Sequence, residues 1–130
     1  MRSDHMKELK LKQVRYEKET WKRLVYFMSE ENICLKNRLS EVLKDSFNYN
    51  LLEQLECFQS RFIDVDSLMN LFRHDLAELE ELLAKGTRGN DHTLIDIQTR
   101  LVTLRTVLTN VERELSKLKI NFHTYLSENI

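Results

Sequence analysis

Hydrophobic residues recur along this chain at alternating intervals of four and three residues, over three long stretches. Residues 51–83 and 94–125 each contain ten apolar residues at this spacing, without an exception. Residues 11–42 follow the same rule with two polar exceptions, Lys18 and Asn32. An average spacing of 3.5 residues places these side chains along one side of an α-helix, where they need to be buried. The pattern therefore predicts three long helices that pack against one another.

We refer to these thirty positions together as the seam. They are Leu11, Val14, Lys18, Trp21, Val25, Met28, Asn32, Leu35, Leu39, Val42, Leu51, Leu55, Phe58, Phe62, Val65, Met69, Phe72, Leu76, Leu79, Leu83, Leu94, Ile97, Leu101, Leu104, Leu108, Val111, Leu115, Leu118, Phe122 and Tyr125.

Two polar segments interrupt the pattern and indicate where the helices end. Residues 45–50 are turn-prone, and residues 85–91 contain both glycines of the chain. Asn50 is a suitable N-cap for the second helix, and Asp91 for the third. Gly86 suits the positive φ that is common just after a helix. We therefore expect three helices, at about 6–45, 51–85 and 92–128.

The predicted fold class is all-α, an antiparallel up-down-up three-helix bundle. Short connections make neighbouring helices antiparallel, and a 3.5-residue seam on a 3.6-residue helix favours a left-handed coiled coil. The chain has 130 residues and no proline, which suits one nearly continuous helical domain. Residues 1–5 have the composition of a vector-derived tail, so we expect the domain to span 6–130.

The antiparallel arrangement also predicts which residues lie at the same level. The basic start of the first helix should lie beside the acidic end of the second helix, residues 75–81. In one seam layer, Val42 should pack with Leu55 and Phe122.

Asn32 is a polar residue at a seam position, level with Val65 and Val111. A single polar residue in such a seam can set the register and the choice of partner, at a cost in stability. The alternative is that a tilt of the helix leaves Asn32 at the rim of the core. We predict a register-setting role for Asn32.

Several large apolar residues lie off the seam, where they face outward. A contiguous patch of such side chains indicates a protein interface. The alternative is a thicker, tilted core that covers them. The candidate interface residues are Tyr26, Phe27, Ile33, Ile63 and Leu71, and the third helix adds Ile95 and Val102.

Residue patterns that carry catalysis or bind cofactors are missing from the sequence. None of the four histidines is preceded at the third position by a glutamate, as di-iron helical bundles require. Cys34 and Cys57 are too far apart along the antiparallel pair to form a disulfide, so we expect free thiols. We therefore predict no enzyme, no metal and no cofactor.

Charge and hydropathy narrow the expected partners. The net charge is −1, so the bulk charge indicates no polyanion, and no apolar run reaches the length that spans a membrane. Without a disulfide framework, cytoplasmic residence is the default expectation. The predicted function is a non-enzymatic protein–protein interaction or structural module that self-associates as a dimer. The alternative is nucleic-acid or membrane-surface binding through the basic start of the first helix.

Trp21 in a first helix, together with a three-helix seam, resembles the architecture of a spectrin-type repeat. The segments 31–39 (ENICLKNRL) and 72–75 (FRHD) are similar to small uncharacterised bacterial helical coiled-coil proteins. Neither resemblance implies an activity or a functional residue.

Overall fold

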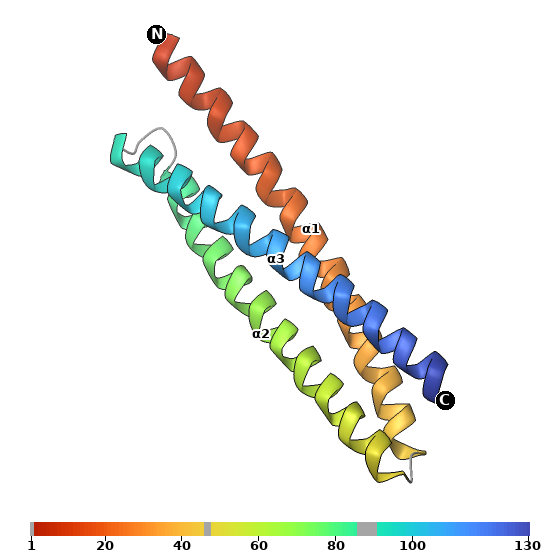
Figure 1. Cartoon of the computed structure of the whole chain (residues 1–130). Coiled ribbons are helices and arrows are strands. Elements are labelled where there is room, and N and C mark those ends of the chain that lie inside the picture. Colours follow the sequence, from red (N-terminus) through yellow and green to blue (C-terminus); the bar gives the residue numbers. More distant parts are fainter. Residues whose placement is uncertain (1, 46–47, 86–90) are drawn as a thin grey trace.

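Three long α-helices make up the structure (Figure 1). The computed structural model describes residues 2–45, 48–85 and 91–130. Helix α1 spans Arg2–Lys44, α2 spans Tyr49–Lys85 and α3 spans Asp91–Asn129. Figure 1 shows α1 and α3 running in the same direction and α2 running in the opposite one. No strand occurs in the described residues, and the predicted all-α, up-down-up three-helix bundle is confirmed.

The buried side chains are those of the seam. Twenty-six described residues are buried, and every one belongs to the thirty seam positions. The other four seam residues are half-buried: Lys18, Leu51, Leu94 and Tyr125. At about 1.5–3 kcal/mol for each large apolar side chain, this burial is the main stabilising contribution. The left-handed supercoil that the 3.5-residue spacing favours stays a prediction.

All three helices begin earlier than predicted, and α1 and α3 end one residue from the predicted positions. Helix α1 begins at Arg2, four residues early, because no proline or glycine interrupts the helix there. Helix α2 begins at Tyr49, and its N-cap is Asn48 rather than Asn50. The backbone N–H groups of Asn50 and Leu51 donate to Asn48 Oδ1, at 2.8 and 3.4 Å. The prediction for Asn50 is therefore wrong, because Asn50 supplies a donor that the cap satisfies.

The sequence also predicts helix-end signals at Gly86 and Asp91, in the connection between α2 and α3. Asp91 is the first residue of α3 rather than the residue before it. Gly86 lies outside the described residues. Its positive φ therefore stays a prediction.

Replacing the cap should weaken the start of α2. We expect Asn48→Ala to lower the free energy of unfolding by about 1 kcal/mol, because two backbone donors lose their acceptor. Asn50→Ala is the matched control and should stay within about 0.5 kcal/mol of the wild type. Urea unfolding followed by circular dichroism measures both. Equal losses for the two variants would contradict the assignment of the cap.

The register between α1 and α2 agrees with the predicted antiparallel alignment. Lys18 and Lys22 lie 3.8 and 3.3 Å from the Glu80 carboxylate, so the basic start of α1 is beside the acidic end of α2. Further toward the N-terminus, Arg15 donates to the carbonyl oxygen of Leu83 at 3.2 Å.

The alignment of α3 is shifted along the bundle axis. The Phe122 ring packs between Phe58 and Phe62, with ring centroids 5.3 and 5.2 Å apart. The seam pattern placed Phe122 level with Leu55, about one helical turn away. Helix α2 packs closely on both neighbours, whereas α1 and α3 approach each other less closely.

Candidate interaction surface

The outward side of α1 carries large apolar side chains in the middle of the bundle. Tyr26, Phe27 and Ile33 are 61%, 66% and 44% exposed, and Tyr16 is 69% exposed about three turns before Tyr26. They are exposed because Val25, Met28 and Asn32 occupy the buried seam, so the residues between them face away. The alternative of a thicker core that covers these residues is excluded. We call Tyr16, Arg23, Tyr26, Phe27, Glu30 and Ile33 the outward face of α1.

Two edges of this face can be distinguished by their neighbours. Tyr26 lies on the edge next to α2, where it lines a shallow cavity of about 330 Å³ together with Arg73 and Glu80. Phe27 lies one helical turn before Glu31, which binds Lys119 of α3 at 2.8 Å, so Phe27 belongs to the edge next to α3. The Tyr26 and Phe27 rings still touch edge to face, with centroids 6.0 Å apart.

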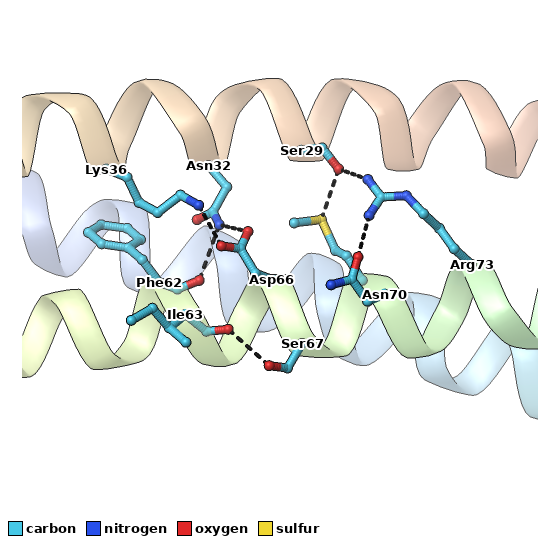
Figure 2. A network of polar contacts seen from close by, with 10 residues as sticks. Ser29, Asn32, Lys36, Phe62, Ile63, Asp66, Ser67, Asn70 and Arg73 are labelled. Atoms are coloured by element: carbon cyan, nitrogen blue, oxygen red, sulfur yellow. Dashed lines mark hydrogen bonds and ion pairs between the residues drawn. The ribbon is translucent and has the colours of Figure 1, made fainter.

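The candidate residues on α2 do not join this face as one group. Ile63 is 54% exposed and faces the side of the α1–α2 pair that Figure 2 shows. Leu71 is 52% exposed, but it lies seven residues before Glu78, which binds Arg100 of α3. Leu71 therefore faces the α2–α3 side. The structure brings Tyr26, Phe27 and Ile33 together, places Ile63 on the neighbouring helix, and separates Leu71 from them.

Asn32 is fully buried and its amide links α1 to α2 (Figure 2). Its Nδ2 donates to the carbonyl oxygen of Phe62 at 3.2 Å and to Asp66 Oδ1 at 2.7 Å. Both partners are acceptors, so the amide orientation follows from the contacts. Asn32 Oδ1 is buried and has no hydrogen-bond partner among the described residues. Asn32 therefore lies in the core, as its seam position predicts, and not at the rim of the core.

Charged and polar residues extend this contact along the α1–α2 side. Lys36 Nζ forms an ion pair with Asp66 Oδ2, so the carboxylate holds Asn32 and Lys36 together. About one turn away, Arg73 donates to Ser29 and, at 2.9 Å, to Asn70 Oδ1. These contacts cover the α1–α2 seam with polar groups, as Figure 2 shows. The sequence pattern does not predict them, because it does not specify which off-seam residues meet.

Ion pairs also connect α3 to the other helices. Arg105 binds both carboxylate oxygens of Glu17 on α1, at 2.7 and 2.8 Å. The hydrogen bond with Glu17 raises the pKa of Arg105. Near the start of α1, Lys18 and Lys22 lie against Glu80 of α2, which partly neutralises their charge.

An apolar groove of about 530 Å³ lies between the N-terminal parts of α1 and α3. Its apolar lining includes Leu11, Val14, Leu94, Leu101 and Val102. Lys7, Lys10, Glu17 and Arg105 also line it. The groove lies where α1 and α3 diverge in Figure 1. The seam pattern does not predict it, because the pattern assumes that all three helices stay equally close.

Among the described residues, no three His, Cys, Asp or Glu side chains gather as metal ligands would. Cys34 and Cys57 are exposed free thiols, as predicted. None of the described helices combines the length and the apolar character that a membrane crossing needs.

Comparison with known proteins adds no relative to this description. No protein-family model, no curated protein sequence and no solved structure matches the chain.

Proposed function

We propose that this bundle is a non-enzymatic protein–protein interaction module that self-associates through the outward face of α1. The observation that carries the proposal is the exposure of Tyr26, Phe27 and Ile33 within eight residues of a helix whose opposite side is fully buried. Aromatic side chains are enriched at protein interfaces, where they bury a large area at a small loss of conformational entropy. A protein partner matches such a face better than a small polar ligand does.

The alternative function, nucleic-acid or membrane-surface binding through the start of α1, has weaker support. Lys18 and Lys22 lie against Glu80, and Arg15 donates to a backbone carbonyl oxygen of α2. Cations that are already paired add little to the binding of a polyanion. We include cytoplasmic residence in the proposal because both thiols are free and exposed.

Sedimentation equilibrium from about 1 µM to 1 mM tests the proposal, because this range brackets ordinary weak dimers. We expect the wild type to form dimers that dissociate on dilution. The double variant Tyr26→Ser/Phe27→Ser should raise the dimer Kd about 30-fold or more, as the loss of two aromatic anchors does. Ile120→Ser, at a position 64% exposed on α3, is the control and should leave the Kd unchanged. A wild type that stays monomeric over the whole range contradicts the proposal.

A further inference from the structure

We infer that the occupant of the outward face of α1 is a second copy of this chain, whose α1 runs antiparallel across a two-fold axis between Tyr26 and Phe27. The inference rests on the proposed function and specifies its partner and geometry. It follows from the order of charges and rings on this face.

Two exposed residues of opposite charge flank the aromatic pair symmetrically. Arg23 lies three residues before Tyr26, and Glu30 lies three residues after Phe27. The two are seven residues apart, so both lie at the centre of the outward face. Arg23 makes one long hydrogen bond, of 3.4 Å to Thr20, and the Glu30 carboxylate has no ion pair in the described chain. Both charges are therefore available to a partner.

With a two-fold axis between the rings, Arg23 and Glu30 of the two copies form two intermolecular ion pairs. The axis exchanges residues that are equally distant from it, so Arg23 of each copy lies opposite Glu30 of the other. Between these pairs, along the edge next to α2, the Tyr26 rings of the two copies meet. Along the edge next to α3, the Phe27 rings meet. Apolar contact at the centre with charge pairs on either side is the usual layout of a specific interface.

The charges also exclude the competing alignments. A parallel pair of α1 helices would place Arg23 beside Arg23 and Glu30 beside Glu30. An antiparallel pair displaced by seven residues would place the two Glu30 carboxylates opposite each other and bring Phe27 opposite Ile33. Like charges across an interface disfavour a pairing. Of these three arrangements, only the one centred between Tyr26 and Phe27 pairs Arg23 and Glu30 with opposite charges.

Charge reversal tests this geometry. Arg23→Glu and Glu30→Arg should each raise the homodimer Kd about ten-fold or more, because each variant brings like charges together. The two variants mixed in equal amounts should form a heterodimer with nearly the wild-type Kd, since each position then meets its opposite. The double variant Arg23→Glu/Glu30→Arg should also dimerise like the wild type. Sedimentation equilibrium gives the Kd, and circular dichroism checks that each variant is folded.

The outcomes separate this inference from the proposed function. If the wild type is monomeric, the proposed function fails and the inference fails with it. If the wild type dimerises but the single variants do so equally well, or their mixture shows no recovery, then self-association stands and the two-fold geometry is overturned.

Disulfide cross-linking supplies an independent readout of the register. The proposed axis places Thr20 of one copy within one residue, about 1.5 Å along the helix, of the level of Cys34 of the other, on the edge next to α3. In a Cys57→Ser background, Thr20→Cys should give covalent dimers under mild oxidation, seen on non-reducing gels. Gln13→Cys lies on the same edge about 10 Å further along the helix and is the matched control. Equal cross-linking of the two variants, or none with Thr20→Cys, overturns the register.

Discussion

Phe62→Ala is expected to lower the free energy of unfolding by about 3–5 kcal/mol, the usual range for truncating a fully buried phenylalanine. Phe62 is 0% exposed, and its ring meets Phe122 edge to face, with centroids 5.2 Å apart. The helices on both sides are long and continuous, so they cannot collapse locally to refill the space that the ring leaves. Such a loss is a large part of the 5–15 kcal/mol that typically stabilises a domain.

Urea unfolding monitored by circular dichroism measures this loss. Ile120→Ala, at an exposed position two residues from Phe122, is the control and should change the free energy by less than about 0.5 kcal/mol. If Phe62→Ala does not fold, Phe62→Leu retains most of the apolar volume and should show a smaller loss of about 1–2 kcal/mol. A loss below about 1 kcal/mol for Phe62→Ala would mean that the ring is not in a packed core.

Asn32→Asp should destabilise the bundle by about 3–5 kcal/mol at neutral pH, although the two side chains have almost the same shape. In the native protein, Nδ2 donates to two acceptors, the Phe62 carbonyl oxygen and Asp66 Oδ1. The replacement places a carboxylate oxygen against both acceptors, in a site with no exposed surface. Burial and the nearby Asp66 carboxylate both oppose ionisation of the introduced group.

The same variant should respond to pH with a defined sign. Burial raises the pKa of the introduced carboxyl group in the folded state above its unfolded value of about 3.9. The difference in stability from the wild type should therefore be smallest below about pH 4, and should grow as the pH rises above that value. Asn32→Val is the uncharged control, and its difference from the wild type should not change in this way. A difference for Asn32→Asp that is constant from acid to neutral pH would contradict the buried placement of residue 32.

The sequence predicts which side of each helix is buried, and the structure agrees at every buried position. This works because the 3.5-residue spacing is a local property, which fixes a direction around the helix axis wherever the partner helix lies. Tyr26, Phe27 and Ile33 could be recognised as outward-facing for the same reason. The cap of α2 was misplaced by two residues, because the region contains Asn48 and Asn50 and the spacing does not distinguish between them.

Only the tertiary structure decides how far the helices slide and separate. Sliding α3 by one turn keeps every seam residue in the core, so the sequence could not predict that Phe122 packs between Phe58 and Phe62. For the same reason it could not predict the groove between α1 and α3, or that Asp66 binds both Asn32 and Lys36. The seam spacing determines the rotation of each helix about its own axis, whereas the axial position and the distance between helices depend on side chains that meet only in the folded bundle.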